Sequence, residues 1–173
     1  MILPILSYPD SKLKQRSSEV EVFDEKLHTL LDDMYETMLS REGVGLAGIQ
    51  VNVSQRILII NIPREDKIQH KEDLLEIINP KITKKEGEIF FTEGCLSVPS
   101  FYEDVLRYDE VELSYQDRFG NPQTLEAQGY LAVAIQHEMD HLDGILFIDR
   151  LSMMKRKKFE KEFKREQRSK GKR

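Results

Sequence analysis

Apolar side chains recur at helical spacing in two parts of the chain. The first stripe consists of Leu27, Leu30, Leu31, Met34, Tyr35, Met38 and Leu39. Its i, i+3, i+4, i+7 spacing predicts an amphipathic helix with Asp24 as N-cap and Gly43 at its end. A second helix should begin near Gly129, because residues 130–135 are apolar on nearly every helical face. We expect this helix to be central and buried, with Gly144 as its C-terminal stop.

The chain between these helices carries the pattern of β-strands. The predicted strands are residues 56–61, 75–80, 81–91 and 105–116. A polar, charged loop fills 63–73, and residues 119–122 turn the chain into a hairpin whose second strand is 123–127. Most connections are hairpin-like and the helices do not alternate with the strands, so the pattern predicts an α+β fold. Antiparallel β-sheets would pack around the central helix, with a C-terminal helix after it.

The composition fits one globular domain. The chain has 173 residues, is 39% hydrophobic and has no long low-complexity run. The first ten residues have no basic group ahead of their apolar positions and are broken by Pro4, Ser7 and Pro9, so we expect no signal peptide. No apolar stretch approaches the ~20 residues that span a bilayer, so we expect no membrane association. The single cysteine excludes an internal disulfide and makes the cytoplasm the expected compartment.

The net charge of −5 hides an asymmetry. Residues 155–173 hold eleven Lys or Arg against three Glu, a net charge of +8, which leaves −13 on residues 1–154. Clustered cations gain affinity for polyanions by releasing counterions from phosphates, although a solvated terminal helix gives the same run of charge. Phe159 and Phe163 are one helical turn apart. We therefore expect a single domain at 1–154 and a basic helical tail at 155–173 that docks by this edge.

Residues His137, Glu138, Met139, Asp140 and His141 form an HExxH segment on the second predicted helix. Side chains four residues apart share a helix face, so the two imidazoles are aimed at one point. Glu138 lies one step round the helix, where a carboxylate reaches a water at the metal without becoming a ligand. Satisfied core histidines would explain either imidazole alone. The joint pattern on a helix indicates a hydrolytic metal site.

Zinc or iron needs a third protein ligand, which this helix cannot supply. The candidates are Cys95, His28, His70 and any of several carboxylates. Cys95 lies where a strand breaks into an irregular segment, although a free cysteine is most often a small buried hydrophobe. We interpret His28, on the first helix, and His70, in the charged loop, as surface residues.

Residues 43–48, Gly-Val-Gly-Leu-Ala-Gly, match the letters of a dinucleotide fingerprint. That fingerprint must follow a strand and open a helix, whereas this segment follows a helix and precedes a strand, so we do not assign nucleotide binding. The glycines instead indicate backbone that lies close to a substrate or another strand. Gln50, just beyond them, offers an amide donor.

Three blocks now stand in order along the chain: Gly43–Gln50, Glu93–Ser97 and Gln136–His141. They closely resemble the peptide deformylase family, whose motifs are GxGLAAxQ, EGCLS and QHExDH, and the length and strand-rich layout also agree. The resemblance implies a hydrolase of protein biosynthesis that removes the N-terminal formyl group from formyl-methionyl nascent polypeptides and releases formate. We expect this hydrolase to be a monomer. It also implies that the basic tail docks on the ribosome near the peptide exit.

By that resemblance, Cys95, His137 and His141 would hold the metal, and Glu138 would be the general acid and base. Metal binding lowers the pKa of a water, Glu138 takes its proton, hydroxide attacks the formyl carbon, and Glu138 protonates the leaving amine. The family resemblance implies Fe2+ in many members and Zn2+ in some, and a thiolate suits both. The sequence does not choose between these two ions.

The same resemblance assigns the contacts to the substrate. Gln50 and the backbone N–H of Leu96 would form the oxyanion hole, and Gly45 would pair with the substrate backbone. The methionine side chain would enter an apolar pocket formed by Val44, Val133 and Ala134, of which the last two share a helix face with His137.

Two positions depart from the family pattern. Gly48 stands where the second alanine of GLAA is usual, which removes a methyl near the expected pocket. We expect an altered fit or a modest loss of stability, with the chemistry intact. Tyr108 follows Arg107 where many relatives carry proline, outside the three motifs.

Two other functions are compatible with parts of the sequence. An HExxH endopeptidase would use the same helix, but it would more often supply a third His or Glu ligand downstream, and none is well placed after His141. A non-catalytic ribosome-associated module with a structural metal would favour four cysteines, or two cysteines with two histidines, whereas this chain has one cysteine.

Overall fold

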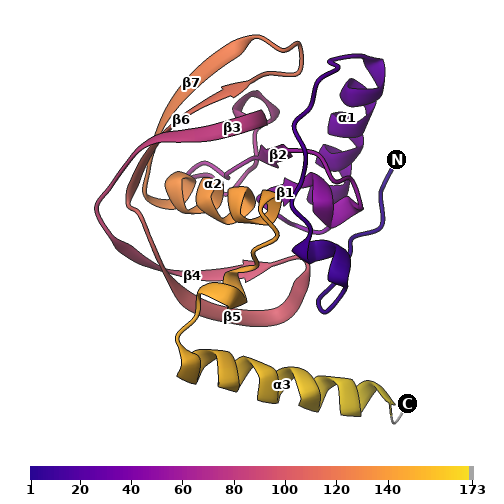
Figure 1. Cartoon of the computed structure of the whole chain (residues 1–173), viewed down its shortest axis with the longest axis vertical. Coiled ribbons are helices and arrows are strands. Elements are labelled where there is room, and N and C mark those ends of the chain that lie inside the picture. The colour runs from indigo at the N-terminus through magenta and orange to yellow at the C-terminus, as the bar shows by residue number, and fades with distance from the viewer. Residues whose placement is uncertain (172–173) are drawn as a thin grey trace.

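Helix α2 (Gly129–Leu142) lies between two antiparallel sheets in the computed structural model, which describes residues 1–171 (Figure 1). The larger sheet has the strand order β1, β2, β3, β6, β7. Its strands are β1 (Gly45–Ala47), β2 (Ile57–Ile60), β3 (Leu75–Glu86), β6 (Glu110–Gln116) and β7 (Pro122–Gln128). The smaller sheet is the hairpin of β4 (Ile89–Cys95) and β5 (Val98–Arg107). The predicted α+β class, with antiparallel sheets around the central helix, is confirmed.

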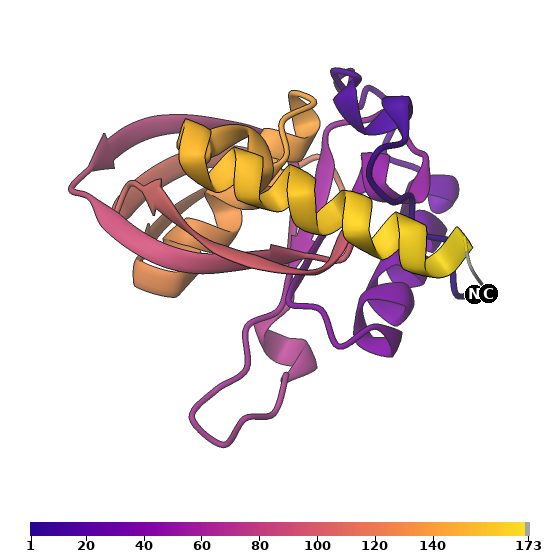
Figure 2. The ribbon, with the colours of Figure 1, turned by 90° about the horizontal axis from the view of Figure 1, so that it is seen from below.

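Two further helices lie outside the sheets. Helix α1 (Glu25–Ser40) packs on the larger sheet, and α3 (Met153–Gly171) runs across the β4–β5 hairpin (Figures 1 and 2). The short 3-10 turns are η1 (Ser11–Lys14), η2 (Gly48–Val51), η3 (Lys71–Asp73) and η4 (Phe147–Arg150). Within residues 1–171, no helix combines the length and apolar character needed to cross a bilayer.

Strand β2 explains how two helices share one sheet. All four of its side chains are buried. Because successive side chains on a strand point to opposite faces, Ile57 and Ile59 join the core under α1. Leu58 and Ile60 join the core under α2. The unbroken run of branched residues in this segment is therefore the pattern of a strand that is buried on both sides.

Helix α2 presents different faces to the two sheets. Ile135 and Leu142 pack into the core of the larger sheet, whereas His137 and His141 contact residues of the β4–β5 hairpin. Burial extends over most of the helix, as predicted. Gly144 follows with a φ of +77° and donates its N–H to the His141 carbonyl, so the predicted C-terminal stop is confirmed.

The end of α1 differs from the prediction. Asp24 caps the helix by accepting the N–H of Leu27, as expected, but the helix ends at Ser40 and Glu42, not Gly43, takes the left-handed conformation. Gly43 has another reason to be glycine. A Cβ atom there would lie 2.9 Å from the side chain of Leu96, so its backbone lies against the loop that follows Cys95.

Two of the predicted strands each span a junction between two observed strands. Residues 81–91 leave the larger sheet at Glu86 and enter the smaller one at Ile89, and residues 105–116 make the return between Arg107 and Glu110. No proline interrupts either junction, and each predicted segment has strand-forming residues on both sides of its junction. The crossing from one sheet to the other is thus invisible in the sequence.

Helix α3 docks by the predicted edge. Phe159 is 2% exposed and packs edge to face on Tyr8 and Phe101, with ring centroids 5.3 and 4.7 Å apart. Phe163 also packs edge to face with Tyr8, with ring centroids 4.9 Å apart. The aromatic cluster joins the tail helix to both the N-terminal segment and the β4–β5 hairpin.

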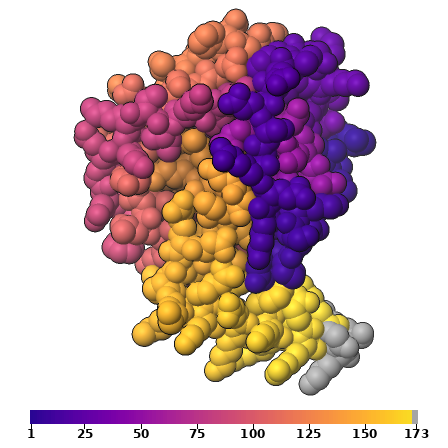
Figure 3. Space-filling model, in the orientation of Figure 1, coloured from indigo at the N-terminus to yellow at the C-terminus, as the bar shows by residue number. Residues whose placement is uncertain are grey.

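Two glycines with left-handed backbone allow packing to be separated from conformational strain. The N-terminal segment (indigo in Figure 3) lies against the segment that follows α2 (orange). Lys14 belongs to the first segment and Gly144 to the second, and a Cβ at Gly144 would lie 2.3 Å from the Lys14 carbonyl oxygen. A Cβ at Gly129, with φ +59°, would meet no atom within 4 Å. We predict that Gly129→Ala lowers the free energy of unfolding by about 1 kcal/mol and Gly144→Ala by about 2–4 kcal/mol. Urea titration checks this, and equal losses would contradict it.

Candidate active site

Three potential metal ligands from two elements meet beside α2. Cys95 is the last residue of β4, and His137 and His141 lie one turn apart on α2. Their donor atoms all lie within 4.8 Å of one another, and Cys95 Sγ is 3.4 Å from His141 Nε2. A tetrahedral ion with bonds of about 2.0–2.3 Å needs donors at roughly these separations. One thiolate and two imidazoles therefore fit a single divalent metal.

Two buried polar atoms beside these donors have no hydrogen-bond partner in the part of the chain described: His141 Nδ1 and Glu138 Oε2. The other carboxylate oxygen of Glu138 lies 3.6 Å from His137 Nε2, on the side where the three donors converge. A buried carboxylate oxygen without a donor is costly. Its position fits a group that bonds to water or to substrate during a reaction.

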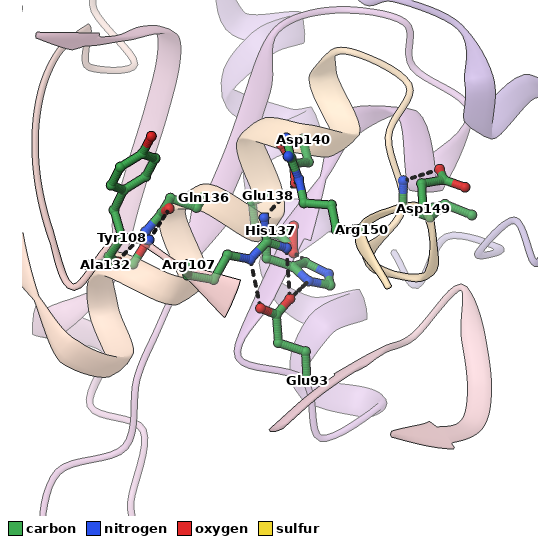
Figure 4. A network of polar contacts seen from close by, with 11 residues as sticks. Glu93, Arg107, Tyr108, Ala132, Gln136, His137, Glu138, Asp140, Asp149 and Arg150 are labelled. Carbon is green, nitrogen blue, oxygen red and sulfur yellow. Dashed lines mark hydrogen bonds and ion pairs between the residues drawn. The ribbon is translucent and has the colours of Figure 1, made fainter. Parts of the chain in front are cut away.

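A buried ion network holds His137 in place (Figure 4). The Nδ1 atom of His137 donates to Glu93 at 2.7 Å, which leaves Nε2 facing the other donors. Arg107 grips both oxygens of Glu93, at 2.7 and 2.9 Å, and donates at 2.6 Å to Asp140. A carboxylate behind a ligating histidine fixes the orientation of the ring and raises its basicity.

The charges of the site follow from this arrangement. Burial opposes protonation of His137, but bonds to Cys95 and Glu93 hold its pKa well above the usual value. Burial lowers the pKa of His141 well below the usual value, so its nitrogen is free to ligate near neutral pH. Burial also raises the pKa of Glu138 to about 7. A carboxyl with that pKa exchanges protons readily near neutrality.

A cavity of about 490 Å³ opens in front of these groups. It is lined by every predicted site residue except one, namely Val44, Gly45, Gln50, Cys95, Leu96, Val133, Ala134, His137 and Glu138. The exception, His141, is completely buried. Phe91 and Tyr130, packed edge to face at 5.0 Å, form a further wall that the sequence did not predict.

Gln50 is buried and aims its amide at the metal-binding face. Its Nε2 donates to Ser97 Oγ at 3.1 Å and approaches Cys95 Sγ at 3.5 Å, while its Oε1 accepts the N–H of Ala47 at 2.9 Å. Because the carbonyl end is held by backbone, the amide cannot flip without losing that bond. The donor end is thereby fixed toward the cavity.

The strand that faces Glu138 has a backbone held from behind. A Cβ at Gly45 would lie 3.1 Å from the Glu138 side chain, so the backbone here lies close to helix α2. Gln69 donates to the carbonyls of Gly43 and Asn61 at 2.9 and 2.7 Å, and the N–H of Asn61 donates to the Val44 carbonyl at 2.8 Å. The loop that we expected to be only a polar surface thus supports one wall of the cavity.

The two departures from the family pattern have different consequences. Gly48 does not line the cavity, and a Cβ there would lie 2.9 Å from the Val53 carbonyl oxygen, so of the two expected effects the geometry favours one on stability. Tyr108 supplies a backbone N–H that proline lacks. This N–H donates to Gln136 Oε1 at 3.0 Å, and Gln136 donates back to the Tyr108 carbonyl, which ties α2 to the end of β5 next to His137.

The other two histidines lie outside the metal-binding group. Both are partly exposed, in agreement with their interpretation as surface residues: His28 contacts the Arg118 carbonyl and His70 contacts Asp66. The residues that the sequence missed are the supporting ones. Glu93 and Asp140 are letters of the EGCLS and QHExDH motifs, so their place in the motifs was the available signal.

Comparison with known proteins agrees with this geometry. The polypeptide deformylase family model matches residues 2–157. A peptide deformylase of Wolinella succinogenes is 62% identical over 168 residues, 97% of this chain and 99% of that protein. A Legionella pneumophila peptide deformylase crystal structure matches with TM-score 0.89 and 40% identity, over 100% of this chain and 99% of that chain. A class I type b peptide deformylase of Acinetobacter baumannii, solved with Met-Ala-Ser bound, gives 0.81 and 33%, over 87% and 99%. The chain therefore belongs to the polypeptide deformylase family.

Proposed function

We propose that the cavity in front of Cys95 and α2 is where this deformylase removes the formyl group from formyl-methionyl nascent peptides and releases formate. The observation that carries the proposal is the convergence of three metal donors, a buried unpaired carboxylate oxygen and a fixed amide donor on one cavity. Membership of the family makes the protein a metal-dependent amide hydrolase. It does not favour the endopeptidase or the non-catalytic module.

Cys95, His137 and His141 would hold the metal, with Fe2+ as the proposed ion and Zn2+ as the alternative. When bound, a divalent ion lowers the pKa of water and acts as a Lewis acid toward the formyl carbonyl. The donor set supports either ion, because a thiolate and two imidazoles suit both. Metal analysis of protein purified without oxygen distinguishes the two.

Glu138 would move the protons. One of its oxygens lies 3.6 Å from His137 Nε2, the other has no hydrogen-bond partner in the described part of the chain, and its pKa of about 7 suits both halves of the task. The carboxylate takes a proton from the attacking water and later gives it to the leaving amine. Because Gly45 has no side chain, strand β1 lies close against this carboxylate, where a Cβ would come within 3.1 Å of it.

Gln50 and the Leu96 N–H would stabilise the oxyanion of the tetrahedral intermediate. Gln50 is held in position before substrate arrives, which is the condition under which such a donor is worth roughly 2.7–4 kcal/mol. Leu96 lies next to Cys95 at the cavity wall.

The proposed substrate would lie along β1. This strand is at the edge of the larger sheet, so an extended peptide can add to its free side, with Gly45 supplying backbone contacts. Val44, Val133 and Ala134 line the same cavity and would receive the methionine side chain. Met-Ala-Ser in the Acinetobacter baumannii relative supports a peptide of this type.

We further propose a cytoplasmic monomer with a catalytic domain at 1–154 and a tail at 155–173 that docks on the ribosome. The support is the charge of +8 on the tail and the exposure of most of its basic side chains, while its aromatic edge faces the protein.

For Glu138, we predict that Glu138→Gln lowers formate release from formyl-Met-Ala-Ser by at least about 10³-fold, because the variant can neither accept nor return the proton. Metal content should stay at one ion per chain. Glu126→Gln, on an exposed strand position, is the control and should match the wild type. More than a tenth of wild-type turnover in metal-loaded Glu138→Gln would rule out the assigned role.

For the metal, we predict that affinity rises with pH between about 6 and 8. The raised pKa of His137 means that it is protonated near neutrality in the metal-free protein, so the metal must displace a proton. The expected slope is about tenfold per pH unit for each proton displaced. Calorimetric titration with Zn2+ in buffers of different ionisation enthalpy counts the protons. Affinity independent of pH would contradict the expectation.

For the tail, deletion of 155–173 is a poor test because it would uncover the aromatic cluster at Phe101. Charge reversal keeps the helix docked. The proposed substitutions to Glu are at exposed positions Lys157, Lys161, Lys164 and Arg168, and the control set is Lys26, Lys67, Lys81 and Lys84. We predict that only the first set weakens ribosome sedimentation, with small-peptide turnover unchanged in both. Equal, salt-dependent binding by both variants would exclude the tail as the docking element.

A further inference from the structure

Asp140 is held between two arginines that come from different parts of the chain (Figure 4). Arg107, at the end of β5, donates to Asp140 Oδ2 at 2.6 Å. Arg150, at the end of turn η4, donates to both carboxylate oxygens, at 2.6 and 2.7 Å. The side chain of Asp140 is 12% exposed, so these charge-assisted bonds satisfy a largely buried carboxylate.

The chain of contacts continues from Arg107 to the metal-binding face. Arg107 donates through Nε and Nη2 to the two oxygens of Glu93, and Glu93 Oε1 accepts from His137 Nδ1. Charges alternate along Glu93, Arg107, Asp140 and Arg150. Only Arg150 is substantially exposed, with 44% of its side chain accessible, against 3% for Arg107 and 4% for Glu93.

The division of donors depends on Arg150. With both oxygens of Asp140 bonded to Arg150, Arg107 gives Asp140 a single N–H from Nη1 and directs its Nε and Nη2 donors to Glu93. Without the Arg150 charge, Asp140 would be a buried carboxylate with Arg107 as its sole cation. Arg107 would then be drawn toward Asp140 and its two-point hold on Glu93 would loosen.

Turn η4 holds Arg150 firmly enough for this role. Asp149 accepts the N–H of Leu146 at 2.9 Å and pairs with Arg156 of α3 at 2.8 Å. Phe147 and Ile148 of the same turn are buried in the core under the β4–β5 hairpin. The position of the guanidinium is therefore set by the fold of the C-terminal segment.

We propose that Arg150 is a positioning residue for His137, acting through Asp140, Arg107 and Glu93. The inference rests on the proposed hydrolysis only for its kinetic readout. Turn η4, which leads into α3, would then help to hold His137 in position. An exposed ion pair that merely stabilised the fold would change the melting temperature and nothing at His137.

The test compares Arg150→Met and Arg150→Lys with a matched control, Arg118→Met. Arg118 also grips a carboxylate at two points, Glu76 at 2.8 and 2.7 Å, but lies outside this network. In the zinc-loaded full-length proteins, three quantities are measured: kcat and KM on formyl-Met-Ala-Ser, the rate of zinc loss to a chelator, and the NMR resonance of the His137 Nδ1–H bonded to Glu93.

For Arg150→Met we expect kcat to fall about tenfold with KM changed less than twofold, and zinc to dissociate about tenfold faster. The Nδ1–H resonance should move upfield and exchange faster with solvent. Arg150→Lys, which keeps the charge but not the two-point grip, should lie between Arg150→Met and the wild type. Arg118→Met should lower the melting temperature without changing the other readouts.

Wild-type kcat, zinc dissociation and resonance in Arg150→Met would overturn the proposal, as would equal effects in Arg118→Met. If Arg150→Met does not fold, Arg150→Lys decides, and wild-type values in it would overturn the proposal. Absence of formate release by the wild type would instead refute the proposed function. The zinc and resonance readouts would still test Arg150 in that case.

Discussion

The buried bonds from Arg107 to Glu93 and Asp140 are the constraint on which the rest of the site depends. Cys95 belongs to a two-stranded hairpin and the histidines belong to a helix, and these elements share little backbone pairing. Arg107 joins them because it bonds to a carboxylate of each, at 2.6–2.9 Å. The three potential metal donors converge because the hairpin is held at this distance from α2.

Such a network makes the site specific rather than the fold stable. Moving two charges out of water costs desolvation free energy, and their attraction offsets about the same amount. A buried ion pair therefore adds little net stability. Breaking one partner is different, since it leaves an unpaired buried charge and costs about 3–5 kcal/mol. The larger sheet and its two apolar cores supply the stability against which this polar interior is built. A third apolar core, under the β4–β5 hairpin, supports the other side of the cavity.

The sequence predicts those features that local physics determines. The helical spacing at HExxH and the caps at Asp24 and Gly144 concern neighbouring residues, and they hold in the structure. The two crossings between sheets were missed because an alternating pattern does not record which sheet a strand joins. The role of Glu93 was missed for a similar reason. The sequence shows that it lies near Cys95, but only the fold shows that it accepts a hydrogen bond from His137. Long-range polar support has no periodic signal.

The central claim is that one ion bridges the hairpin and α2 at the bottom of the cavity. Anomalous diffraction at the absorption edge of the bound metal, from crystals of metal-loaded protein, tests it most directly. We expect one peak per chain at bonding distance from Cys95 Sγ, His137 Nε2 and His141 Nε2, about 2.0–2.3 Å. A peak at other residues, or none in crystals of protein that releases formate, would contradict it.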